Sequence, residues 1–166
     1  MNNRGQNTEY RRQNLDSFNA EAQIIVAKYD KKSAAVLPLL HFAQDKIGYV
    51  TPEAEAWVAK HSEVPLVHVH EVVTFYSMYH KNPVGKNHIR FCTTTSCVLM
   101  GGEKVLAHLK KKLGVENGGV TEDGKFSLEE AECLCACEVA PMMQVQDKYY
   151  GPLDEKKVDE ILDKIK

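Results

Sequence analysis

Apolar positions in the first half of the chain recur at helical spacing. The stretches "AEAQIIVAKY" at 20–29 and "SAAVLPLLHFAQDKIG" at 33–48 each predict an amphipathic helix, and Gly48 is a suitable stop for the second. The stretch "TPEAEAWVAKH" at 51–61 predicts a third helix with Thr51 as its N-cap. This half of the chain is therefore expected to be helical.

The next segment, "VPLVHVHEVVTFYSMY" at 64–79, carries two conflicting signals. Its residues Val67, His68, Val69 and His70 alternate between apolar and polar as in a strand. Its length and the proline near its start suit a helix instead. The pattern of residues leaves both structures open.

The stretch "KNPVGK" that follows predicts a break between two domains, because it combines a proline and a glycine with polar residues. We expect a first, largely helical domain at 17–85 and a second domain at 86–166. The residues before them, 1–16, are polar with almost nothing to bury, which is typical of a flexible tail.

After the break the pattern becomes that of a mixed α and β domain. Strands are predicted at 88–92 and 125–133, a helix at 98–114 and a hairpin at 142–151. A last helix, capped by Asp154, carries one apolar stripe. The whole chain is accordingly expected to be α+β or α/β.

Composition adds limits on the class of protein. The 166 residues are 43% hydrophobic, which can supply a core without disulfides, and the net charge of -2 comes from interspersed charges that offer no basic field for nucleic acid. No apolar run approaches the ~20 residues that span a bilayer, and the first residues lack the order of a signal peptide. We therefore expect a cytoplasmic protein, in which cysteines stay reduced.

The five cysteines are the candidate chemistry. Four residues separate Cys92 from Cys97, and three separate Cys133 from Cys137, with Cys135 between the last two. Each pair follows a predicted strand, so the two loops can face each other, and four thiolates suit either an iron–sulfur cluster or a structural zinc. Spacing does not choose between these metals. Buried reduced cysteines, or a redox pair of Cys135 with either neighbour, are the alternatives without metal.

Longer stretches around these cysteines resemble a known family. The chain is similar to the thioredoxin-like [2Fe-2S] ferredoxin family, and within it to the 24-kDa, or E, subunits of NADH:quinone oxidoreductases. The stretches that carry the resemblance are "LPLLHFAQDKIGYVTPEA" at 37–54, "HEVVTFYSMY" at 70–79, "CTTTSCVLMGGE" at 92–103 and "DGKFSLEEAECLCACEVAPMMQV" at 123–145.

The resemblance implies a structure and a set of ligands. It implies that "HVHEVVTFY" at 68–76 is helical, and that an N-terminal helical bundle precedes a thioredoxin-like domain. It also implies one [2Fe-2S] cluster with Cys92, Cys97, Cys133 and Cys137 as its ligands.

The resemblance further implies a role in electron transfer. The cluster would exchange single electrons with the FMN of a partner subunit that binds NADH and FMN, on the cytoplasmic side of the bacterial inner membrane. The equivalent subunit of an NAD-dependent formate dehydrogenase or hydrogenase is the nearest alternative. An interaction module stabilised by zinc on four cysteines is the alternative from another class.

The chain departs from the family at Cys135, where members commonly have glycine in "CLGAC". Glycine at this place would permit a positive φ or a close approach of the backbone, neither of which a cysteine allows as cheaply. We expect Cys135 to be a bystander rather than a ligand. The Ala140–Pro141 bond lies where thioredoxin-like folds often carry a cis-proline, and a cis bond is our hypothesis for it.

Overall fold

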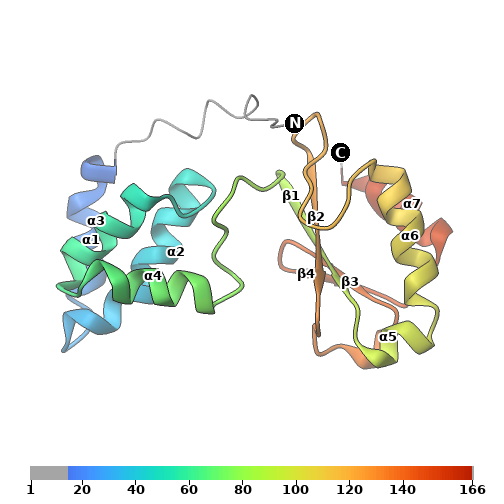
Figure 1. Cartoon of the computed structure of the whole chain (residues 1–166), viewed down its shortest axis with the longest axis horizontal. Coiled ribbons are helices and arrows are strands. Elements are labelled where there is room, and N and C mark those ends of the chain that lie inside the picture. Colours follow the sequence, from blue (N-terminus) through green and yellow to red (C-terminus); the bar gives the residue numbers. More distant parts are fainter. Residues whose placement is uncertain (1–14, 166) are drawn as a thin grey trace. The chain divides into compact units, whose positions relative to one another are not determined.

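The chain divides into two compact units, Met1–Pro83 and Val84–Lys166. The computed structural model describes residues 15–165 (Figure 1). The predicted tail at 1–16 therefore lies outside the described residues except for its last two, and Leu15 is already buried. Within the described residues, no helix combines the length and the apolar character that a membrane span requires.

The first unit is built from helices alone in the part that the structure describes. Caps that were expected from the sequence are present: the Thr51 hydroxyl accepts a hydrogen bond from the Ala54 N–H at 3.1 Å, and Gly48 ends its helix with φ of 90°. The elements are η2 (Leu15–Phe18), α1 (Asn19–Val26), η3 (Lys32–Ala35), α2 (Val36–Ile47), α3 (Pro52–Ser62) and α4 (Leu66–Phe75).

Helix α4 settles the ambiguous segment. Val69 and Val73, four residues apart, are 0% and 2% exposed, whereas Val67 is 64% exposed. In a strand Val67 and Val69 would share one face, so this burial is that of a helix. The helix that the resemblance implies for 68–76 is confirmed, and α4 contains all of it except the last residue.

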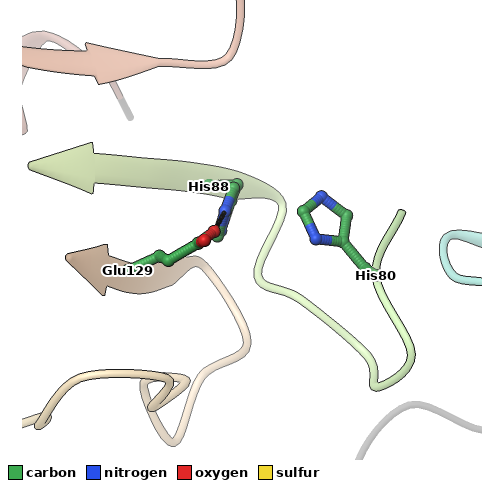
Figure 2. Close-up of side chains that lie close together, drawn as sticks. All are labelled: His80, His88 and Glu129. Carbon is green, nitrogen blue, oxygen red and sulfur yellow. Dashed lines mark hydrogen bonds and ion pairs between the residues drawn. The ribbon is translucent and has the colours of Figure 1, made fainter. Parts of the chain in front are cut away.

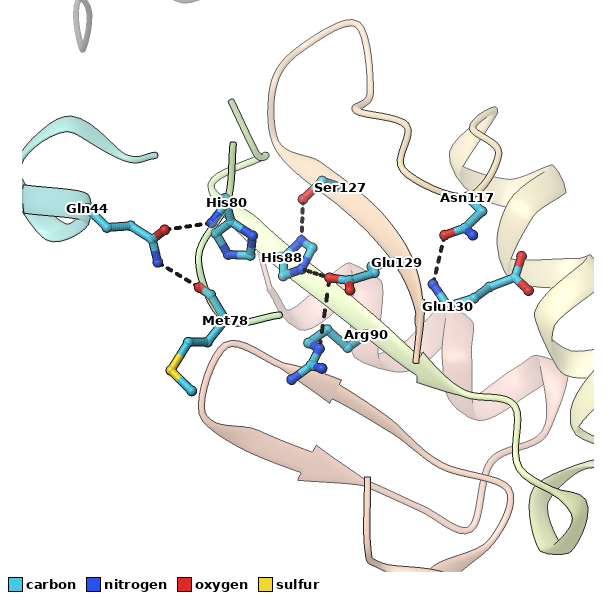
Figure 3. A network of polar contacts seen from close by, with 9 residues as sticks. All are labelled: Gln44, Met78, His80, His88, Arg90, Asn117, Ser127, Glu129 and Glu130. Carbon is cyan, nitrogen blue, oxygen red and sulfur yellow. Dashed lines mark hydrogen bonds and ion pairs between the residues drawn. The ribbon is translucent and has the colours of Figure 1, made fainter. Parts of the chain in front are cut away.

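Gln44 ties the segment after α4 to helix α2. Its side-chain amide donates to the Met78 carbonyl at 2.9 Å, and its amide oxygen accepts from the His80 N–H at 2.7 Å (Figure 3). Tyr79 is buried beside them, and its hydroxyl donates to the Leu37 carbonyl at 3.1 Å. These bonds satisfy backbone groups of the irregular segment that follows α4.

The second unit is a four-stranded sheet with helices. The sheet order is β2-β1-β3-β4; β1 and β2 are parallel, and the other two pairs are antiparallel. Helices α6 and α7 lie on one side of the sheet and bury a common core with it (Figure 1). The elements are β1 (Asn87–Cys92), α5 (Thr95–Leu99), α6 (Gly102–Leu113), β2 (Phe126–Ala131), η4 (Cys137–Val139), β3 (Met143–Val145), β4 (Lys148–Tyr150) and α7 (Glu155–Lys164).

The predicted single helix at 98–114 is wrong in one respect. The structure breaks it into α5 and α6 at Gly101, which has φ of 89° and cannot continue a right-handed helix. Gly102 then packs against α5 so closely that a Cβ would lie 2.6 Å from the Cys97 carbonyl oxygen. The two glycines thus set a sharp turn directly after the helix that carries Cys97.

Candidate metal centre

The parallel pairing of β1 and β2 brings the two cysteine loops to the same end of the sheet. Cys92 is the last residue of β1 and pairs with Ala131, the last residue of β2. Cys97 follows within α5, while Cys133 lies two residues after β2 and Cys137 begins η4. Because parallel strands end on the same edge, cysteines about forty residues apart in the chain are brought to one region of the domain.

Backbone bonds hold these loops together. The Thr93 N–H and the Thr93 hydroxyl both donate to the Ala131 carbonyl, at 2.9 and 3.1 Å. The Cys92 N–H donates to the Met142 carbonyl at 3.2 Å, which joins the strand end to the residue after Pro141. The Ala140–Pro141 peptide bond is cis, as hypothesised from its position.

The five sulfurs differ in exposure. Cys92 and Cys97 are buried, with 2% and 1% of their surface exposed, whereas Cys133, Cys135 and Cys137 are exposed. The two buried thiols belong to an apolar cluster with Ala131, Leu134, Ala136, Ala140 and Met142. Two of the four predicted ligands are therefore shielded from solvent, and the other two are accessible to it.

Burial has an electrostatic consequence for Cys97. It raises the pKa of this thiol to about 11, with the neighbouring thiol of Cys92 adding to the effect and a backbone contact with Met142 partly opposing it. A buried thiolate in an apolar shell is costly unless a positive charge compensates it. Iron supplies such a charge, so the buried pair suits a metal centre better than it suits free thiolates.

Cys135 stands apart in its backbone. It has φ of 55°, in the left-handed region that favours glycine. Its N–H donates to the Cys133 sulfur at 3.4 Å, and the two sulfurs are 3.8 Å apart. The hydrogen bond to Cys133 is the first cause that raises the pKa of the Cys135 thiol.

Most of the chain matches the model of one known protein family. Residues 22–166 match the model of the family described as thioredoxin-like [2Fe-2S] ferredoxin. The chain belongs to the thioredoxin-like [2Fe-2S] ferredoxin family. The prediction of this family from the sequence is confirmed, as is the expected fold of helices followed by a thioredoxin-like domain.

E subunits of NADH-quinone oxidoreductases match this chain over most or all of its length. The chain is 43% identical to the E subunit of the NADH-quinone oxidoreductase of Rickettsia bellii, with 100% of the chain and 99% of the relative covered. It is 40% identical to the E subunit numbered 2 of the NADH-quinone oxidoreductase of Rhizobium meliloti, with 86% and 85% covered.

A solved structure shares the fold. The H2-reduced state of an NAD+-reducing [NiFe]-hydrogenase contains a region that matches this ferredoxin with a TM-score of 0.70 at 19% identity, over 82% of this chain and 23% of that chain. At this identity the likeness shows a common fold and no more.

Membership in this ferredoxin family implies a [2Fe-2S] cluster, and the donor set fits one. The cysteines near the end of the sheet supply four thiolates without any need for Cys135. The assignment of Cys92, Cys97, Cys133 and Cys137 as ligands stays a prediction, because it rests on spacing, placement and family resemblance.

A second polar group in the ferredoxin domain was missed by the reasoning from sequence. The His88 ring contacts the Ser127 hydroxyl through Nδ1 at 2.8 Å (Figure 3). Its Nε2 lies 2.8 Å from the Glu129 carboxylate, and Figure 2 shows these two side chains close together. Glu129 also lies 3.9 Å from the Arg90 guanidinium (Figure 3). The one available signal was the alternation of "HIRFC", which places His88, Arg90 and Cys92 on one face of β1.

Proposed function

We propose that this chain is the electron-transfer subunit of an NADH:quinone oxidoreductase. Its [2Fe-2S] cluster, held by Cys92, Cys97, Cys133 and Cys137, exchanges single electrons with the FMN of a partner subunit that binds NADH. The observation that carries the proposal is the placement of the two cysteine pairs at the shared end of β1 and β2, in a chain whose full-length relative is the E subunit of such a complex.

The chain's own residues determine the environment of the cluster. A [2Fe-2S] cluster accepts and releases one electron at a potential that depends on hydrogen bonds to its sulfurs and on exposure to solvent. The Cys135 N–H donates to the Cys133 sulfur at 3.4 Å, and such a donor favours the more negative, reduced form. The apolar cluster that contains Cys92 and Cys97 keeps water away from these two cysteines.

Exposed residues of the site and next to it support docking of the partner. Cys133 and Cys137 are exposed, and two apolar side chains that follow Cys97 in the chain, Leu99 and Met100, are 80% and 63% exposed. Exposed apolar side chains beside a redox centre suit an interface with another protein. We assign these residues to the interface with the subunit that carries FMN and NADH.

The glycine pair after Cys97 supports the placement of the nucleotides on that partner. Gly101 and Gly102 could suggest a phosphate-binding loop, but Gly102 packs against the Cys97 backbone and Gly101 makes the turn between α5 and α6. Their structural roles account for both glycines.

The location that we propose follows from the role in the complex. It is the peripheral part of a respiratory complex, on the cytoplasmic side of the inner membrane.

Purification of the full chain without oxygen tests the proposal. We expect a red-brown protein with about two irons per chain and a paramagnetic signal that appears only on reduction. A colourless protein with stoichiometric zinc would contradict it and favour a zinc-stabilised module. Isolation of the native complex then shows whether the flavoprotein partner belongs to an NADH:quinone oxidoreductase, or to a formate dehydrogenase or hydrogenase.

A further inference from the structure

Cys135 has no part in the proposed ligand set, yet its sulfur lies close to that of a ligand. The 3.8 Å between the Cys133 and Cys135 sulfurs compares with about 2.05 Å in a disulfide, so the two sulfurs are already in contact and must approach further to bond. The N–H of Cys135 also donates to the Cys133 sulfur, which holds the two residues in this arrangement.

The other thiols are less suited to reaction. Cys92 and Cys97 have at most 2% of their surface exposed, so an oxidant in solution does not reach them in the folded chain. Cys137 is exposed and begins η4, but the sulfur that Cys135 contacts is that of Cys133. Cys133 and Cys135 are therefore the two thiols that are both accessible to an oxidant and in contact with each other.

We propose that Cys133 and Cys135 form a reversible disulfide when the chain has no cluster. This inference rests on the proposed function only for the role of Cys133 as a ligand. A sulfur in a disulfide cannot act as a thiolate ligand, so the disulfide and the cluster exclude each other. The disulfide keeps Cys133 from oxidation to sulfinic or sulfonic acid, which is irreversible, until a thiol reductant restores it.

The oxidant is a small-molecule disulfide such as glutathione disulfide. The Cys133 thiolate attacks one of its sulfurs, which forms a mixed disulfide and releases one glutathione thiolate. The Cys135 thiolate then attacks the Cys133 sulfur, which forms the internal bond and releases the second glutathione. In total the two cysteines lose two electrons and two protons, and glutathione disulfide gains them.

The positive φ of Cys135 favours a labile bond. A disulfide between residues separated by one residue closes a very small ring, and the left-handed backbone adds to the strain. Strained and exposed disulfides have higher reduction potentials and are the ones that reductants open readily. The bond is therefore suited to temporary protection and not to holding the fold.

The test uses the full-length chain after removal of iron with a chelator and reduction. The chain is exposed to glutathione disulfide, quenched with acid, alkylated in denaturant and mapped by mass spectrometry. Fragmentation within the peptide between Lys125 and Lys148, which contains all three exposed cysteines, locates the link.

We expect the wild type to lose two of its five thiols to one internal bond between Cys133 and Cys135. Dithiothreitol should return both thiols and, with them, the ability to take up a cluster. Cys135→Ser should retain glutathione on Cys133 and form no internal bond, and Cys135→Gly, which suits the backbone better, should behave in the same way.

A bond between Cys135 and Cys137, or glutathione on all three exposed cysteines without an internal bond, would overturn the inference. The outcome is separate from that of the proposed function. If the internal bond forms but Cys133→Ser keeps a normal cluster, the ligand assignment fails and the disulfide stands. If the cluster requires Cys133 but no internal bond forms, the ligand assignment stands and the disulfide inference fails.

Discussion

Replacement of Cys135 by glycine should stabilise the protein, although most substitutions destabilise. Cys135 has φ of 55°, and a left-handed backbone costs a residue other than glycine roughly 1–2 kcal/mol. Glycine removes that strain, but it also gains freedom in the unfolded chain that is worth roughly 0.5–1 kcal/mol. The net gain in the free energy of unfolding should be on the order of 0.5–1 kcal/mol, or about 2–8 °C in Tm for a domain of this size.

The assay is thermal and chemical unfolding of the full chain with a thiol reductant present, which keeps disulfides from contributing. Ala136→Gly is the matched control, because Ala136 is the next residue and has φ of -129°. It gains the same unfolded freedom with no strain to relieve and loses a buried methyl group, so it should destabilise by roughly 1–2 kcal/mol.

The two variants should thus move stability in opposite directions. If Cys135→Gly lowers Tm as Ala136→Gly does, the backbone of Cys135 is not strained and the reasoning is refuted. The visible absorbance of the cluster should persist in Cys135→Gly. If it disappears there while Cys133→Ser retains it, the ligand set is wrong.

Three further substitutions test other parts of the structure. Thr51→Ala removes the hydrogen bond to the Ala54 N–H and should cost about 1 kcal/mol in chemical unfolding, whereas Thr51→Ser should stay near wild type; equal losses would refute the capping role. Gly102→Ala places a Cβ 2.6 Å from the Cys97 carbonyl oxygen, so it should destabilise by about 1–3 kcal/mol and weaken retention of the cluster; unchanged Tm and absorbance would contradict the close packing. The hydrogen bond from His108 is the main reason that the pKa of Asp159 lies below its usual range. The ionised carboxylate therefore stabilises the fold at any pH above the pKa that Asp159 has in the unfolded chain. This stabilisation is lost as the pH falls through the lower pKa of the folded chain. Asp159→Asn should therefore lower Tm at pH 7 more than at pH 3, and an equal loss at both would refute the pairing.

Local signals in the sequence were enough for the helix ends. The N-cap at Thr51 and the stop at Gly48 depend on bonds within one turn, and both are present. Helix α4 was different, because its alternating residues fitted two periods equally well. The burial of Val69 and Val73 against the rest of the bundle decides for the helix, and this tertiary packing cannot be read from the segment itself.

The candidate site was predictable only in part, because some of its contacts depend on strand pairing between distant parts of the chain. The spacing of the cysteines and the strands before them predicted two facing loops, and the register of β1 on β2 places both loops at one end of the sheet. The family resemblance predicted the cofactor, which the match to the family supports. The contact between His88, Ser127 and Glu129 depends on pairing between residues about forty positions apart. The alternation in β1 indicates which face His88 is on but not which residues of β2 it contacts.

The turn at Gly101 was missed because glycine tolerates both hands of backbone, so a helical pattern can run through it or stop at it. The backbone of Cys135 could be anticipated, in contrast. Members of the family commonly have glycine at this position, which indicated a positive φ, and Cys135 has φ of 55°.

The parallel pairing of β1 with β2 also determines when the cluster can be assembled. A parallel pair needs a long crossover, here the chain through α5 and α6, and contacts between residues so far apart form late and slowly during folding. The two cysteine pairs that are predicted as ligands therefore come together only when this sheet forms. If all four are ligands, complete coordination of the cluster requires the folded sheet, and the loop that carries Cys133 and Cys137 is the accessible part of the site. Amide exchange in the metal-free chain should accordingly show β1 protected before any cofactor is added.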